Sequence, residues 1–334
     1  MRDKKSCPSV FYGGQALLEG VMMKGTHSCA CAVRSPDGEI KKTISEQKSV
    51  KDRVKILKLP VLRGVVNFIE MLKLGFQTLN YSAEVSGLEE EEAKPGKVET
   101  FLTEKCGVSM MNVVMGVAGV IGVALALFLF LFLPAKVVGF GAGILPGWLL
   151  TVIEGVVKIL IFVLYLFLVS RMKEIHRVFE YHGAEHKTIH CYEHGEELTP
   201  ENVKKYTRYH PRCGTSFLIL TLIVSILVSS LVTWDNVLIR VALKVVTLPL
   251  TMGLAYELIR LAGKYNNPVT RAISAPGKWM QMLTTNEPDE SEIECAITAL
   301  KLVLDHEGVE NFPEVREGCT REFEIEKQPE EASA

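Results

Sequence analysis

The sequence has little that would mark a nucleic-acid-binding protein, an enzyme with a phosphate-binding loop or a chain with a cleaved signal peptide. Its 334 residues have a formal net charge of -2 and no strong basic stripe, which gives no reason to expect nucleic acid as a partner. The glycine-rich stretch 12–25 does not end in the lysine and serine or threonine of a phosphate-binding loop. The first long apolar run begins near residue 109, too far along the chain for a cleaved signal peptide.

Long apolar runs are what the sequence has in abundance. Hydrophobic residues make up 48% of the chain, and its mean hydropathy of +0.20 is high for a wholly soluble protein. Four runs are long enough to cross about 30 Å of hydrocarbon as helices. They are residues 109–133, 148–170, 216–233 and 237–261. The sequence therefore predicts an α-helical polytopic membrane protein with four transmembrane helices and a small α+β cytoplasmic domain.

Lysine and arginine are unevenly distributed among the connections between these runs. The loop 171–215 carries eight basic residues, whereas 134–147 carries Lys136 alone and the turn 235–236 carries none. By the positive-inside rule this loop is cytoplasmic, and four spans then place both termini on the cytoplasmic side of the cell membrane. Because the cytosol keeps thiols reduced, no disulfide framework is expected from the eight cysteines.

Three regions follow from this topology. Residues 1–108 form a cytoplasmic N-terminal region with a glycine-rich loop, a β-hairpin, an amphipathic helix and an acidic linker. Residues 109–261 form the four-helix membrane domain, whose cytoplasmic loop 171–215 is rich in histidine. Residues 262–334 form a cytoplasmic C-terminal region that ends in a disordered acidic tail.

Local patterns predict several elements of the cytoplasmic regions. The stretch 12–25 contains four glycines and is either a structural turn or a site loop that offers Gln15 and Glu19. The segments 28–34 and 39–45 flank a turn and predict the β-hairpin, with Cys29 and Cys31 as small buried residues on a strand. Helical spacing over 60–83 predicts an amphipathic helix that lies on the membrane surface or covers the cytoplasmic domain. A capping box at 291–294 begins a further helix.

A histidine-rich motif lies in the cytoplasmic loop. Ile175, Phe179, His182 and His186 follow one another at helical spacing, so the second span is expected to continue into the cytoplasm with both imidazoles facing inward. Two histidines four residues apart on a helix can bind one metal ion, and His-x-x-Glu-His is the inverted zincin pattern, with Glu185 as general base. Hydrogen-bonded core histidines are the alternative interpretation.

Further donors surround this pair. His190 and His194 continue the spacing, but four histidines in one column cannot all bind one ion, so these two are assigned a supporting or surface role. His210 and Cys213 add a nitrogen and a sulfur donor where the chain returns to the membrane, and Glu19 could join them if its loop folds back. Mixed nitrogen, sulfur and oxygen donors predict a divalent metal, with zinc as the first choice and iron or manganese as the second.

Four separated blocks of the chain resemble the signature blocks of the YqhQ family of bacterial multi-pass membrane proteins. The blocks are Gly13–Gly25, Tyr181–Thr188, His210–Phe217 and Ala275–Thr285. The family's function is not established, and its members are described as predicted metal-dependent enzymes, so the resemblance implies a membrane protein and metal dependence. Lys278 and Lys24 stand where the family pattern has leucine and arginine, and neither is a proposed ligand.

Three functional hypotheses remain. The first is a metal-dependent hydrolase at the cytoplasmic membrane surface, acting on an amide, ester or phosphoester; peptidase chemistry would need a further acidic ligand such as Glu257. Its ligands are His182, His186, His210 and Cys213, and its catalytic carboxylates are Glu185 and Glu19. The second is a non-catalytic scaffold or assembly factor with a structural metal site. The third is a transporter that uses Glu154 and Lys158, which stand one turn apart and are expected to neutralise each other, together with Lys244.

The expected partners follow from the predicted location. They are membrane lipid and a substrate at the membrane surface, with an oligomer or a second membrane protein left open.

Overall fold

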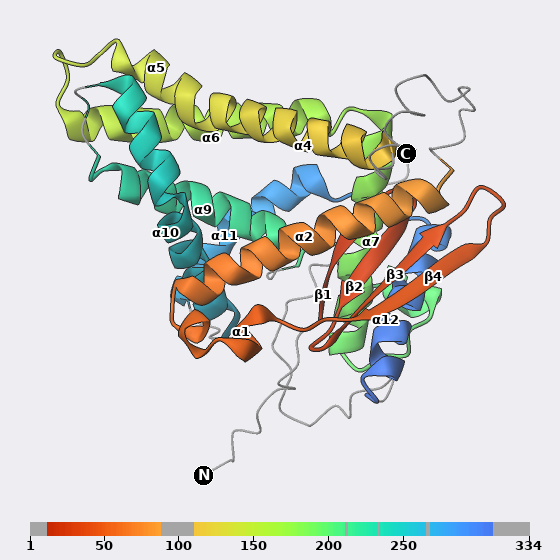
Figure 1. Ribbon diagram of the computed structural model, residues 1–334. Coiled ribbons are helices and arrows are strands. Elements are labelled where there is room, and N and C mark those ends of the chain that lie inside the picture. Colours follow the sequence, from red (N-terminus) through yellow and green to blue (C-terminus); the bar gives the residue numbers. More distant parts are fainter. Residues whose placement is uncertain are drawn as a thin grey trace.

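The computed structural model describes residues 12–87, 110–210, 213–232, 234, 236–264 and 268–309, and helices predominate in it (Figure 1). The strands are β1 (Gly13–Leu17), β2 (Gly20–Lys24), β3 (Ser28–Arg34) and β4 (Ile40–Glu46). The longer helices are α2 (Leu62–Val85), α4 (Met110–Leu127), α6 (Gly147–Val169), α7 (Lys173–Glu193), α9 (Gly214–Ser229), α10 (Val237–Lys264), α11 (Pro268–Thr284) and α12 (Glu290–His306). The shorter elements are α1 (Val50–Arg53), η1 (Lys55–Lys58), η2 (Phe128–Phe132), α5 (Leu133–Gly139) and α8 (Pro200–Lys204).

The four strands that the structure describes form one antiparallel sheet in the order β1-β2-β3-β4. The hairpin predicted from 28–34 and 39–45 is confirmed as β3 and β4. The glycine-rich stretch forms a second hairpin, β1 and β2, with its turn at Leu18 and Glu19. Gly20 is required in this hairpin because a Cβ atom there would overlap the Ala32 carbonyl oxygen of the neighbouring strand.

Helices cover both faces of the sheet. Met22, Cys29, Cys31 and Val33 point to one face and pack against α2, which contributes Leu74. The two cysteines are buried there on a strand, as predicted. On the opposite face the sheet packs against α7 and α12, and the shared core contains the residues Val21, Met23, Ala30, Ala32, Tyr181, Ala184, Ile189, Ile293, Ala296 and Leu300. This core joins the strands, which precede the apolar helices in the sequence, to α7, which lies between α6 and α9, and to α12, which follows α10.

The amphipathic helix predicted over 60–83 is confirmed as α2, which covers the sheet and also contacts α10. Arg63 on α2 forms an ion pair with Glu257 on α10, so Glu257 is engaged away from the histidines. The predicted capping box lies two residues earlier than expected. Asp289 caps α12 and Glu292 completes the box, because the helix begins at Glu290.

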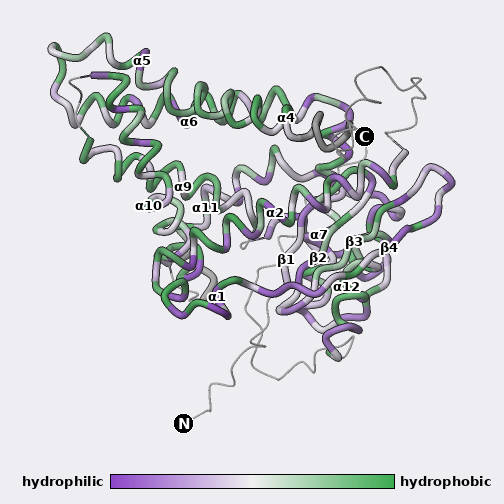
Figure 2. The backbone as a smooth tube through the Cα atoms, viewed as in Figure 1, coloured by the Kyte–Doolittle hydropathy of each residue, from purple (hydrophilic) through white to green (hydrophobic). Residues whose placement is uncertain are grey.

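Three helical segments of the described chain are long and apolar enough to cross a membrane. They cover Gly116–Gly139, Gly147–Val169 and Val237–Leu261. Figure 2 shows their hydrophobic residues along α4, α5, α6 and α10, whereas hydrophilic residues concentrate around the sheet. The first segment continues past Pro134, because the π-helical η2 precedes the proline and accommodates its missing N–H. The predicted third span corresponds to α9, which has only 16 residues.

The second apolar helix does not continue into the histidine helix, contrary to the prediction. The helix α6 ends at Val169, where Ser170 donates its hydroxyl to the Phe167 carbonyl at 2.8 Å, and α7 begins separately at Lys173. A polar side chain that bonds its own backbone favours a helix end at this point.

Charged side chains within the apolar helices pair between helices rather than within α6. Glu154 forms ion pairs with Arg240, at 2.8 Å, and with Lys244, both on α10. Lys158 instead donates to the Ser225 hydroxyl on α9 at 3.1 Å. The expected neutralisation of Glu154 by Lys158 is therefore wrong, because the Glu154 carboxylate forms its ion pairs with Arg240 and Lys244 of α10 instead.

Candidate metal centre

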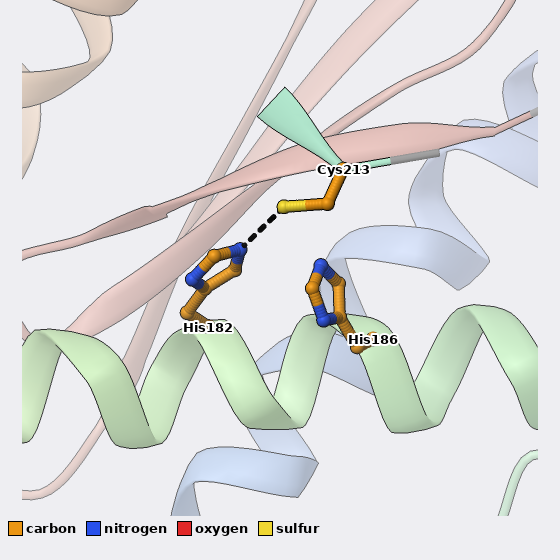
Figure 3. A group of neighbouring side chains, drawn as sticks. All are labelled: His182, His186 and Cys213. Atoms are coloured by element: carbon orange, nitrogen blue, oxygen red, sulfur yellow. Dashed lines mark hydrogen bonds between the residues drawn. The ribbon is translucent and has the colours of Figure 1, made fainter. Parts of the chain in front are cut away.

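Three side chains, from α7 and from the start of α9, point toward one another (Figure 3). His182 and His186 lie on one face of α7, one turn apart, with ring centroids separated by 4.4 Å. Cys213 lies opposite them, at the N-cap of α9. One donor atom from each of the three lies within 4.8 Å of the others, and His182 Nε2 is 3.1 Å from the Cys213 sulfur. This spacing is compatible with a shared metal ion.

Backbone carbonyls fix the orientation of both imidazoles. His182 Nδ1 is 2.7 Å from the Thr284 carbonyl oxygen, and His186 Nδ1 is 2.5 Å from that of Arg208. Because a carbonyl can only accept, each Nδ1 carries a hydrogen, so Nε2 is the atom of each neutral imidazole that offers a lone pair to a metal ion. Metal-binding histidines typically donate their second ring N–H to a carbonyl in this way.

The free lone pair of His186 is the sharpest indication of a ligand. Its Nε2 is buried and has no hydrogen-bond partner among the described residues, and the side chain is 1% exposed. A buried acceptor left without a partner costs about 1–3 kcal/mol. A metal ion bound beside Cys213 would satisfy this nitrogen, so the residues present fit such an ion.

Cys213 is in a setting that favours the thiolate. The Thr215 N–H and hydroxyl both donate to its sulfur, at 3.5 and 3.3 Å, and the N-terminus of α9 favours a negative charge. Burial alone would raise the pKa of the Cys213 thiol, but His182 and His186 hold that pKa well below its usual value. Burial likewise lowers the pKa of His182, but Cys213, Glu185 and the Thr284 carbonyl together raise it to about 9.

Glu185 lies beside the three donors and is 5% exposed. The backbone N–H of Gly14 on β1 donates to its carboxylate, so the glycine-rich segment does fold back onto α7. A Cβ at Gly14 would lie 3.0 Å from the Glu185 side chain, and glycine is therefore what permits this approach. Burial raises the pKa of Glu185, while the neighbouring histidines oppose that shift.

Glu19 does not join this group. Its carboxylate forms an ion pair with Arg177 and accepts a hydrogen bond from the Tyr181 hydroxyl at 3.3 Å. Glu19 also has a backbone φ of 52°, which matches its place in the tight β1–β2 turn. The hairpin therefore presents Gly14, rather than Glu19, to the donors on α7.

His210 lies next to the three donors but belongs to a neighbouring group. Both backbone polar atoms of His210 bond to the Gln281 side-chain amide, at 2.7 Å each. Its ring lies 5.5 Å from that of His186 and 4.7 Å from that of His190, centroid to centroid. Donor atoms of His190, Glu193 and His210 lie within 4.8 Å of one another.

Sequence reasoning missed the residues of α11 that support the site. Gln281 positions His210, and Thr284 orients His182. A signal was present, because both residues fall in the block Ala275–Thr285 that resembles the YqhQ family. His194, assigned a supporting or surface role, donates from Nδ1 to the His190 carbonyl of its own helix at 2.7 Å.

Comparisons with known proteins agree with the resemblance. Residues 59–306 match a family model described as "Protein of unknown function (DUF1385)", a range that contains α7, Cys213 and α11. The chain is also 35% identical, over 297 residues, to "Uncharacterized protein YqhQ" of Bacillus subtilis (strain 168), with 88% of this chain and 92% of that protein covered. No solved structure matches the chain. The family model spans more than half of the sequence and the relative spans most of it, and the chain therefore belongs to the YqhQ family.

Proposed function

We propose that this protein is a metal-dependent membrane enzyme, a hydrolase whose site lies at the cytoplasmic membrane surface. The observation that carries the proposal is the convergence of His182, His186 and Cys213, with the unpartnered Nε2 of His186 directed into a buried site. Two imidazoles with a thiolate are a donor set that suits zinc. The ion would polarise a scissile carbonyl or phosphoryl group and lower the pKa of a water molecule.

The protein's own residues supply the rest of the chemistry. Glu185 is the general base, because it is the carboxylate beside the donors and is held in place by the Gly14 N–H. The two carbonyl hydrogen bonds keep the Nε2 atoms of His182 and His186 aimed at the site. The thiolate of Cys213 offsets the charge of a bound cation.

The position of the site suggests a substrate at the bilayer surface. Cys213 directly precedes the apolar helix α9, and the partner carbonyl of His182 belongs to Thr284, the last residue of α11. An amide, ester or phosphoester of an amphiphilic molecule would reach this place from the membrane. Membrane lipid is accordingly the proposed partner, with the site facing the cytoplasm.

Metal content tests the first part of the proposal. We expect full-length protein purified in detergent to hold zinc, and His182→Ala and Cys213→Ser to hold less zinc than wild type, since each removes one of three donors. His194→Ala is the matched control, because that histidine lies on the same helix outside the donor group. Zinc content that is unchanged in the two donor variants would sink the proposal.

Activity tests the second part. Glu185→Gln should retain zinc but hydrolyse micellar ester, amide or phosphoester substrates about 10²–10⁴-fold more slowly, the usual contribution of general-base catalysis. Equal rates for Glu185→Gln and wild type would remove Glu185 from the mechanism.

The alternative is a scaffold or assembly factor with a structural metal site. The deep burial of Cys213 and His186, 7% and 1% exposed, favours this second candidate. Cobalt in place of zinc distinguishes the two. An absorption spectrum that responds to added anions indicates an open coordination position and supports the enzyme, whereas a closed tetrahedral spectrum supports the scaffold.

A further inference from the structure

A second group of donors lies directly beside the first. It consists of His190 and Glu193 on α7 and His210, whose donor atoms lie within 4.8 Å of one another. His190 and His210 are each 2% exposed. His210 Nε2 is 3.7 Å from the nearer carboxylate oxygen of Glu193. Two buried imidazoles and a carboxylate are a frequent donor set for divalent metals.

Hydrogen bonds hold the imidazole of His190 and the backbone of His210 in place. His190 Nε2 is 3.0 Å from the Tyr209 carbonyl oxygen, so Nε2 carries the hydrogen and Nδ1 keeps the lone pair. His210 is held through its backbone by the two hydrogen bonds to Gln281. A carbonyl therefore orients His190 as well, one turn further along α7, but through Nε2 rather than through Nδ1 as in His182 and His186.

The two groups are contiguous. His182, His186 and His190 follow one another at four-residue spacing on one face of α7, and the His210 ring contacts those of both His186 and His190. In proteins that bind two metal ions for hydrolysis, the ions are about 3.5–4 Å apart and their ligands are shared or adjacent. His182, His186 and His190 extend too far along α7 to bind one ion together, so we assign them to two adjacent ions.

We propose that His190, Glu193 and His210 bind a second divalent cation, so that the centre holds two ions side by side. This inference rests on the proposed metal dependence of the first group and extends it. The second set contains no thiolate, so it suits an ion that prefers nitrogen and oxygen ligands, such as manganese or ferrous iron, as well as zinc. The first set retains the thiolate and the softer ion.

Cobalt binding separates the two sites. Full-length protein in detergent is stripped with chelator and loaded with Co²⁺, and the bound cobalt per chain is measured together with the near-ultraviolet absorption of a thiolate-cobalt bond. Wild type should bind two ions and show that absorption. His190→Ala and Glu193→Gln should each lose one ion and keep the absorption, which also reports that the first site is folded.

The complementary variants and controls complete the design. Cys213→Ser should lose the thiolate absorption while the second site keeps its ion. His194→Ala and Glu196→Gln, matched in residue type and position along the chain, should bind two ions. One ion per chain in wild type together with the thiolate absorption, or two ions in both His190→Ala and Glu193→Gln, would overturn the second site. Loss of the proposed function gives a different result, because wild type would then bind cobalt without thiolate absorption.

Discussion

Gly183 lies on α7 between the two histidines that we propose as ligands, and its missing side chain leaves room for the chain that follows α11. A Cβ atom at Gly183 would overlap the backbone oxygen of Asn286. That backbone is fixed in turn, because the Asn286 N–H donates to the Phe179 carbonyl at 2.8 Å. Gly183→Ala should therefore lower the free energy of unfolding by about 1–3 kcal/mol, the usual cost of overpacking.

Thermal unfolding in detergent checks this prediction. Gly13→Ala is the matched control, since nothing lies within 4 Å of a Cβ at that glycine. Equal melting temperatures for the two variants would contradict the close approach of residue 286 to α7.

Glu292, in the first turn of α12, predicts a dependence of stability on pH. Burial raises its pKa from 4.5 to about 8. The hydrogen bond from the Asp289 N–H and the charge of Arg177 oppose this shift, while the charges of Asp289 and Glu180 add to it. In this interval the folded chain holds a proton that the unfolded chain has released, so the free energy of unfolding falls as the pH rises from about 4.5 to 8. The stabilisation is complete below that interval and lost above it.

Melting temperatures of wild type and Glu292→Gln between pH 5 and 9 test the assignment. The glutamine keeps an oxygen for the Asp289 N–H, which donates to Glu292 at 3.0 Å, but cannot ionise. The variant should therefore lose less stability over this interval than wild type. Parallel profiles for the two proteins would show that Glu292 is not the group that titrates.

The side chains that could bind the metal ion were easier to predict from the sequence than the backbone groups that orient them. The i, i+4 spacing of His182 and His186 identified two members of the group, and Cys213 was included on its chemistry. The carbonyls of Arg208 and Thr284 orient the imidazoles, and a backbone atom leaves no residue-specific signal. His210 was predicted to bind the same ion as His182, His186 and Cys213. Sequence spacing alone does not indicate that its ring lies instead in the adjacent group with His190 and Glu193.

At the scale of elements, a proline and glycine turn made the β3–β4 hairpin predictable, whereas the β1–β2 hairpin has no such turn and was not predicted. The β3–β4 connection contains Pro36 and Gly38, with φ of 87° at Gly38. The β1–β2 turn has Leu18 and Glu19 instead, and Glu19 adopts a positive φ without being glycine. Its conformation is stabilised by tertiary contacts to Arg177 and Tyr181, which no local sequence pattern contains.

The interhelical charges predict which substitution in the apolar helices is costly. Glu154 is the carboxylate partner of both Arg240 and Lys244, and all three are buried. Glu154→Gln should lower the free energy of unfolding by about 3–5 kcal/mol, because it removes the charged carboxylate that the two buried cations share. Lys158→Met should be neutral or stabilising, since Lys158 contacts the Ser225 hydroxyl rather than the carboxylate.

Unfolding of the two variants in the same detergent gives the comparison. An equal loss of stability would support the pairing of Glu154 with Lys158 that their four-residue spacing suggests, and would contradict the pairing between α6 and α10.

At the scale of the whole molecule, the shared core constrains how the chain crosses a membrane. One core is shared by β2, β3, α7 and α12, so these four elements lie on one side of the bilayer. The chain must then cross an even number of times between β3 and α7, and α4–α5 and α6 are two helical segments long and apolar enough to do so. It must also cross an even number of times between α7 and α12, where α9, α10 and α11 lie, and α11 is not among the apolar helices of the described residues. If α10 crosses, α9 crosses as well.

The length of α9 is the difficulty for this topology, since 16 residues rise about 24 Å against about 30 Å of hydrocarbon. Local thinning of the bilayer can accommodate such a mismatch at modest cost. Protease sites inserted after Gly38, Gly143 and Leu231 test the crossing. Protease outside intact cells should cut after Gly143 and Leu231, and protease outside inverted vesicles should cut after Gly38 alone, with the unmodified chain as control. Cleavage after Leu231 on the same side as Gly38 would place α9 and α10 together on the cytoplasmic side and make the four-span topology wrong.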